Sequence, residues 1–200
     1  GALLSLYDRI YRAIRAVDPH HVIFLEDRGP GTSMDELPPP RRRNWQHIVY
    51  SFHPYLFDKH DAPSHRAFVD ERLRTYEAFA ASRNCPVLIG EFHPQGGDES
   101  WRYYLTTFNA RGTHWTLWSY KCSARMGDWG IVRTSVSPDV QSNTYAQLRV
   151  AFAQYATQPG SINTNLTALI AACNAAARTN THAIPVPPSP VLRSFRLSTP

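Results

Sequence analysis

The sequence predicts an α/β fold built around a parallel sheet. Four short apolar runs are typical of strands, and amphipathic segments with helical spacing lie before, between and after them. Strands that alternate with helices form parallel pairs, because each helix returns the chain to the same end of the sheet. The length of 200 residues suits one domain, or one domain followed by a tail.

The first element is an amphipathic helix over residues 3–17, because its apolar residues recur at steps of three and four. Asp18 and Pro19 end this pattern, since the residue before a proline is disfavoured in a helix. The next three elements are a strand at 22–25, a loop rich in Gly and Pro at 28–44, and a strand at 48–52.

Capping residues define the helices of the middle of the chain. Ser64 can cap a helix that runs to about Arg83. A second helix opens at Asp98 or Ser100 and ends at Gly112. The remaining predictions are strands at 86–89 and 114–120, helices at 144–157 and 163–178, and a Pro-, Ser- and Arg-rich tail or linker at 181–200 after a folded unit over 1–180.

The composition argues against nucleic acid, membrane and metal as partners. The net charge is +5, but the arginines are scattered apart from Arg41 to Arg43, which we predict to lie in a solvated loop. No apolar run approaches the ~20 residues of a membrane span. Cys85, Cys122 and Cys173 show no metal-ligand spacing, and they fit either one bridge with a free thiol or three reduced thiols.

Each predicted strand ends in polar or aromatic side chains. Glu26 follows the first strand, His53 and Tyr55 follow the second, Glu91 follows the third, and Trp118 lies near the end of the fourth. The carboxyl ends of parallel strands share one edge of a sheet, where parallel-sheet enzymes place their chemistry. We therefore expect these side chains to form one site.

Glu91 is the candidate catalytic carboxylate. It follows the apolar run of residues 86–89 and has no charged neighbour in the sequence. Burying such a group without a partner costs several kcal/mol, so it faces a cavity or accepts structural hydrogen bonds at the strand end. The segment alone leaves both interpretations open.

Four motifs, taken in order, resemble glycoside hydrolase family 5. They correspond to the entry to its fifth strand, a His-any-Tyr signature after an apolar strand, the strand that bears the nucleophilic Glu, and the last strand. The likeness extends over about residues 3–155 and comes nearest to cellulase-like endo-glucanases and glucosidases. In this sequence the motifs are residues 18–26, His53-Pro54-Tyr55, residues 86–92 and residues 115–121.

The resemblance implies an eight-stranded β/α (TIM) barrel, of which this chain is a half-barrel corresponding to roughly the last four strands. It implies that Glu91 is the nucleophile of a retaining β-glycoside hydrolase, with Tyr55 donating a hydrogen bond that keeps it ionised. His53 would belong to the network around the pair of carboxyl groups. Trp118 would form the floor of the subsite for the cleaved sugar, and Trp129 either extends the groove or packs on its own loop.

The second carboxyl group that the family uses is missing. Retaining glycosidases need two carboxyl groups ~5–5.5 Å apart, and the family's acid/base Glu follows an Asn at the end of the fourth strand. No Asn-Glu pair occurs in this sequence. Glu26 is predicted to be a rim carboxylate and Glu99 a helix-start carboxylate, so we expect the chain alone to be weakly active or inactive.

The resemblance also implies the substrate and partners. We expect a β-glucan or oligosaccharide substrate, no metal or organic cofactor, and an extracellular location. A half-barrel exposes two sheet edges, so the missing half-barrel or a second copy of the chain has to cover them. The alternative is a non-catalytic half-barrel that binds carbohydrate or acts as an assembly unit.

Overall fold

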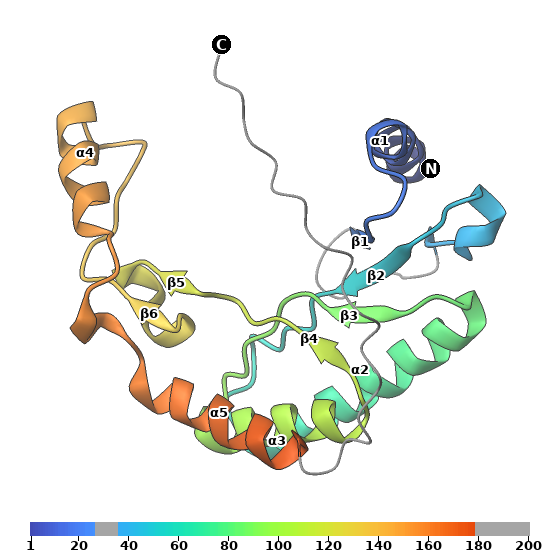
Figure 1. Ribbon diagram of the computed structural model, residues 1–200. Helices are drawn as coiled ribbons and strands as arrows, with labels where there is room; N and C mark the ends of the chain where they lie inside the picture. Colours follow the sequence, from blue (N-terminus) through green and yellow to red (C-terminus); the bar gives the residue numbers. More distant parts are fainter. Residues whose placement is uncertain (27–35, 179–200) are drawn as a thin grey trace.

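The computed structural model describes residues 1–26 and 36–178 (Figure 1). Its centre is a four-stranded parallel sheet with the strands side by side in chain order, β1-β2-β3-β4. This confirms the predicted α/β class with a parallel sheet. The strands are β1 (Ile23–Glu26), β2 (Ile48–Phe52), β3 (Val87–Ile89) and β4 (His114–Trp115).

The register aligns the carboxyl ends of the strands. Leu25 pairs with Tyr50, and Tyr50 pairs with Val87 on its other side. Helix α2 (Ala62–Arg83) connects β2 to β3, and α3 (Gly97–Ala110) connects β3 to β4. Each of these two crossovers returns the chain to the same end of the sheet, which makes β2-β3 and β3-β4 parallel, and β1 also pairs with β2 in parallel.

The hydrophobic core lies between the sheet and these helices. Figure 1 shows α2 and α3 on one side of the sheet, with α5 (Thr164–Arg178) alongside α3. Phe52 of β2 stacks on Tyr76 of α2 with ring centroids 4.7 Å apart. Phe92, just after β3, is fully buried and meets Phe108 of α3 edge to face. Helix α1 (Ala2–Val17) packs partly buried apolar residues against the same core.

A second, smaller sheet follows the main one, and its presence corrects the predicted fourth strand. Residues 114–120 were expected as one strand, but β4 ends at Trp115, and the backbone N–H groups of Ser119 and Ile131 bond to the carbonyls of Trp129 and Ser119. The chain thus leaves β3 for a new partner. The additional elements are β5 (Lys121–Cys122), η3 (Ala124–Trp129), β6 (Val132–Arg133), α4 (Tyr145–Gln154) and η4 (Pro159–Ser161).

Two local predictions are also corrected. Helix α2 is capped by Asp61, whose side chain accepts from the backbone N–H of Ser64, so Ser64 lies inside the helix and is not its cap. The arginine triplet forms the short helix η2 (Pro40–Arg43), and Arg43 pairs with Asp8 of α1 at 2.6 Å rather than lying in a solvated loop. The predicted tail at 181–200 lies outside the described residues.

Three general expectations can be compared with the described residues. No helix among them is long and apolar enough to cross a membrane. Within the same ranges, no cluster of three or more His, Cys, Asp or Glu side chains is arranged to hold a metal ion. Cys85, Cys122 and Cys173 are all buried and unbridged, which decides between the two cysteine interpretations.

Candidate active site

The candidate site lies at the carboxyl ends of the first three strands. Glu26 is the last residue of β1, His53 comes directly after β2, and Glu91 comes two residues after β3. Because these strands are adjacent and parallel, their ends meet at one rim, as the sequence predicted.

Tyr55 and His53 both contact the carboxylate of Glu91. The Tyr55 hydroxyl donates to Glu91 Oε2 at 2.9 Å, and His53 Nδ1 lies 3.5 Å from the same oxygen. The other ring nitrogen of His53 is 3.1 Å from Glu26 Oε1. His53 therefore lies between two carboxyl groups, with a hydrogen bond to Glu26 and a longer contact with Glu91.

The hydroxyl of Tyr55 remains protonated in this setting. Burial raises the pKa of Tyr55 above its ordinary value, and the hydrogen bond to Glu91 raises it further. A protonated phenol is a donor, and a bond from it to a carboxylate is charge-assisted and strong. Tyr55 thus remains a hydrogen-bond donor to the half-buried carboxyl group of Glu91.

Gly90 lets the rim close tightly around Glu91. A Cβ atom added there would collide with Ser51 Oγ and would lie 2.9 Å from His53 Nε2. The backbone N–H of Gly90 donates to Phe52 O at 2.9 Å, which holds β3 against β2 at this level. The packing of the site therefore requires a residue without a side chain at position 90.

Trp129 belongs to a stack of rings that includes Tyr55, the hydrogen-bond donor to Glu91. It lies parallel to His93 with centroids 4.5 Å apart, and it also stacks on Tyr55 at 6.0 Å and Phe57 at 6.2 Å. The indole therefore packs on rings from the segments after β2 and β3. Through Tyr55, this stack supports the hydrogen bond to Glu91.

Trp118 lies in the segment after β4, alongside the residue that follows Glu91. Its backbone N–H donates to the carbonyl of Phe92 at 3.2 Å, and its side chain is 42% exposed. A large exposed indole near a carboxylate offers a flat surface for a sugar ring. Glu99 lies elsewhere, in the first turn of α3, where it pairs with Arg66.

Sequence reasoning missed two aromatic residues of the site. Phe57 stacks on Tyr55 with centroids 4.9 Å apart, and His93 lies between Trp129 and the edge of Trp101. Each missed residue stands two positions after a predicted one, the spacing that puts side chains of an extended segment on the same side. That spacing was the available signal.

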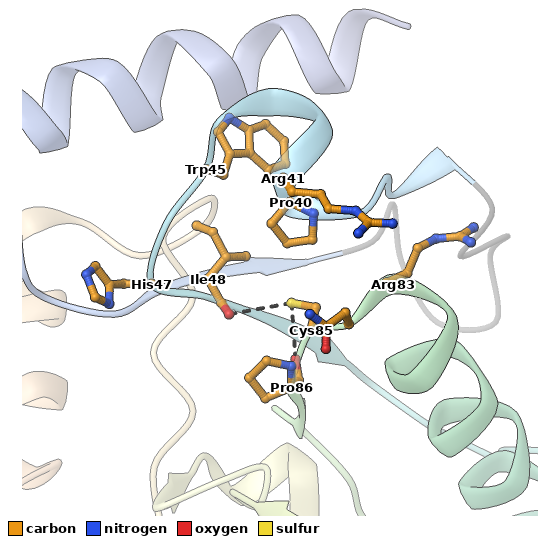
Figure 2. Close-up of a pocket in the computed structure, with 9 residues that line it drawn as sticks. Pro40, Arg41, Trp45, His47, Ile48, Arg83, Cys85 and Pro86 are labelled. Atoms are coloured by element: carbon orange, nitrogen blue, oxygen red, sulfur yellow. Dashed lines mark hydrogen bonds between the residues drawn. The ribbon is translucent and has the colours of Figure 1, made fainter.

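A pocket of about 220 Å³ at the other end of the sheet is a poor candidate (Figure 2). It is lined by Ile48, which opens β2, and by Cys85 and Pro86 before β3. The Cys85 thiol donates weakly to the carbonyls of Ile48 and Pro86, and burial raises its pKa to about 11. None of the described residues that line this pocket is a carboxylate, and the amino-terminal ends of barrel strands serve stability.

The family model for cellulase, glycosyl hydrolase family 5, matches residues 1–123, which include all three strand ends of the site. The chain belongs to glycoside hydrolase family 5. A β-xylosidase of Phanerodontia chrysosporium is 29% identical over 157 residues, covering 66% of this family 5 chain and 32% of the relative.

Solved structures add a comparison of the fold. A family 5 mannosidase of Rhizomucor miehei, solved as a mutant, has a TM-score of 0.57 at 14% identity, over 88% of this chain and 48% of that one. An endo-β-1,4-glucanase of Xanthomonas axonopodis pv. citri reaches only 0.34 at 16% identity, over 55% of this chain and 37% of its own, so it carries no argument. The family 5 chain thus spans about a third of the xylosidase and half of the mannosidase.

Proposed function

We propose that the chain supplies the nucleophile side of a retaining β-glycoside hydrolase that acts on β-glucans, as an endo-glucanase of the cellulase type does. The observation that carries this proposal is the hydrogen bond from Tyr55 to Glu91 Oε2 at 2.9 Å, with His53 in contact with the same oxygen. A carboxylate held by donors at the carboxyl rim of a parallel sheet is suited to nucleophilic attack.

From their contacts, we propose different roles for the two carboxylate oxygens of Glu91. Oε2 accepts the hydrogen bond from Tyr55, so Oε1 is the oxygen that we assign to attack on the anomeric carbon. The bond from that carbon to the leaving oxygen breaks as an ester to Glu91 forms. Water then attacks the same carbon, and release of the carboxylate restores Glu91.

We propose that the acid that protonates the leaving oxygen comes from outside this chain. Glu26 contacts the opposite ring nitrogen of His53 from the one that faces Glu91, and it ends the strand that resembles the family's fifth rather than its fourth. We propose that the four strands are the last four of a barrel whose first half supplies the acid/base Glu. The coverage of about half of the mannosidase supports this assignment.

The exposed apolar side chains at the β1 edge of the sheet also favour coverage by another half-barrel. β1 is an edge strand, and Phe24, in its middle, is 53% exposed, as is Val22 before it at 50%. Exposed apolar side chains beside unpaired strand groups favour coverage by another segment. We propose that the first half-barrel covers this edge and that a second copy replaces it when the chain is alone.

The names of the relatives widen the range of glycosides that should be tested as substrates. The relatives are described as a β-xylosidase and a mannosidase, and both names denote glycoside cleavage. We therefore propose a β-glycan with β-1,4-glucan as the first choice, and an extracellular location where such polymers occur. No cofactor is needed, because the proposed chemistry uses carboxyl groups and water.

An activated substrate tests the nucleophile without the missing acid. 2,4-Dinitrophenyl β-glucoside has a leaving group that needs no proton, so the chain should release a burst of dinitrophenolate and then turn over slowly. Added azide should accelerate turnover and give a β-glucosyl azide, because azide attacks the ester without a general base. Cellobiose should be cleaved weakly or not at all.

Two carboxylate variants provide the control. Glu91→Gln should abolish the burst, whereas Glu99→Gln, on the exposed start of α3, should leave it unchanged. A burst that survives Glu91→Gln would overturn the assignment of the nucleophile. Cellobiose hydrolysis at the rate of complete barrels would contradict the proposal that the acid lies outside the chain.

The second candidate function is non-catalytic carbohydrate binding, which the 42% exposure of Trp118 favours. It predicts that cello-oligosaccharides quench tryptophan fluorescence with no turnover of the activated substrate, and that Trp118→Ala removes this binding. A burst that depends on Glu91 would decide against it.

A further inference from the structure

A second cavity is lined by two rings of the stack, those of His93 and Trp129. Its volume is about 690 Å³, within the ~300–1,000 Å³ typical of ligand pockets. It is formed by the segment after β3 and the beginning of α3, by η3 and β6, and by the beginning of α5. Neither Glu91 nor Tyr55 lines it, so the cavity is separate from the proposed nucleophile.

Aromatic rings form one wall of this cavity. Trp129 and Trp101 both line it, with His93 stacked on the first at 4.5 Å and meeting the second edge to face at 5.1 Å. These contacts fix the orientation of both indoles. Trp101 is only 6% exposed, so the partly exposed Trp129 supplies most of the apolar surface that a sugar ring can contact.

The charged lining of the cavity is predominantly positive. Among the described side chains that line it, Arg125 and Arg133 are positive and Asp98 is the one carboxylate. Arg125 is 72% exposed, and its contact with Asp139 is long, at 3.9 Å. A pair this long and exposed contributes little, so the guanidinium can exchange it for a better acceptor. Guanidinium groups bind carboxylates through two parallel hydrogen bonds.

Neutral amides complete the lining. Asn163 uses its Oδ1 to accept from the backbone N–H of Leu166 at 3.2 Å, so its NH₂ group is the donor that it can offer a ligand. Asn165 and Gln95 also line the cavity. Amide donors and acceptors beside indole rings are the groups that bind sugar hydroxyls.

We propose that this cavity is a binding site for an acidic sugar, a uronic acid unit of an oligosaccharide. The carboxylate pairs with Arg125 and Arg133, and the ring lies against the indole wall. The inference rests on the proposed function only in taking the substrate to be a carbohydrate. It requires no catalysis by Glu91, so the two ideas fail separately.

Two disaccharides that differ in one group test this site. Cellobiouronic acid carries a carboxylate where cellobiose has a hydroxymethyl group on its non-reducing ring. Calorimetric titration of the Glu91→Gln protein, in which turnover is prevented, should show at least tenfold tighter binding of the acid. Arg133→Gln and Arg125→Gln should each reduce this preference at least fivefold, and added salt should weaken it.

Controls separate the site from general charge attraction. Arg149→Gln changes an exposed arginine on α4, away from the cavity, and should leave the preference intact. Equal affinity for the two disaccharides, or a preference that survives both cavity variants, would overturn the proposal. Inorganic phosphate that competes as strongly as cellobiouronic acid would show a simple anion site and would also overturn it.

Discussion

Replacing Gly90 with alanine tests how tightly the rim is packed around Glu91. The added Cβ would collide with Ser51 Oγ and would lie 2.9 Å from His53 Nε2, closer than such atoms approach in folded proteins. Ser51 is buried and His53 is held between two carboxylates, so neither side chain moves freely. The strand must therefore shift to accommodate the methyl group.

The expected cost is that of overpacking a well-packed interior. Such changes destabilise by about 1–3 kcal/mol, which is a sizeable part of the ~5–15 kcal/mol that stabilises a typical domain. Because the shift moves His53 as well, the burst that depends on Glu91 should also fall. Urea denaturation followed by circular dichroism measures the first effect, and dinitrophenolate release measures the second.

Two further variants, Gly160→Ala and Ser51→Ala, test whether the collision at residue 90 causes the loss of stability. Gly160→Ala places its methyl group in open space and should leave the urea midpoint unchanged or slightly raised. Ser51→Ala removes the colliding oxygen, so the double variant should be more stable than the sum of the single effects predicts. A Gly90→Ala protein as stable and active as the parent would refute the packing argument.

Three further predictions concern single groups. Tyr55→Phe keeps the ring stack but removes the hydroxyl that donates to Glu91, so the burst rate should fall about tenfold or more with an unchanged circular dichroism spectrum; an unchanged rate would deny the hydroxyl a role. The pKa of Asp61 is lowered by the hydrogen bonds with which it caps α2, so its stabilisation is present above the unfolded pKa of about 3.9 and is lost as the pH falls through the lower folded pKa. Asp61→Ala should thus lower the urea midpoint at pH 7 and differ less from the parent in acid, and an equal difference at both pH values would contradict this. Burial raises the pKa of Cys85 to about 11 and that of Cys173 above its ordinary value. Neither thiol should therefore react with a disulfide reagent at pH 8 before urea is added. Rapid reaction of these thiols in the native protein would disprove their burial.

The parallel sheet was accessible from the sequence because its strands are unambiguous apolar runs. The strand at 48–52 was predicted with the bounds that β2 has, since it is buried on both sides and flanked by polar residues. The run at 114–120 was misjudged because its apolar residues continue beyond β4. Its later half pairs with residues 129–132, a long-range contact that no local pattern records.

The sequence was sufficient to predict that the site residues lie together, because they follow adjacent parallel strands. The aromatic residues that pack around them could not be predicted, because those contacts depend on tertiary packing. Glu91 and Tyr55 were placed together because β2 and β3 are neighbours, and the structure has them in a hydrogen bond. Their catalytic roles remain predictions. The stack of His93 on Trp129 joins two loops 36 positions apart, and loop-to-loop contacts of this kind are set by tertiary structure.

The central claim is that Glu91 forms a covalent bond to the sugar, and trapping that bond tests it most directly. 2,4-Dinitrophenyl 2-deoxy-2-fluoro-β-glycosides, offered in gluco, xylo and manno forms, need no acid to react and give slowly hydrolysed esters. Intact-mass and peptide mass spectrometry should show one fluoroglycosyl group per chain, attached at Glu91. A label on another residue, or a folded protein that none of the three reagents labels, would contradict the account.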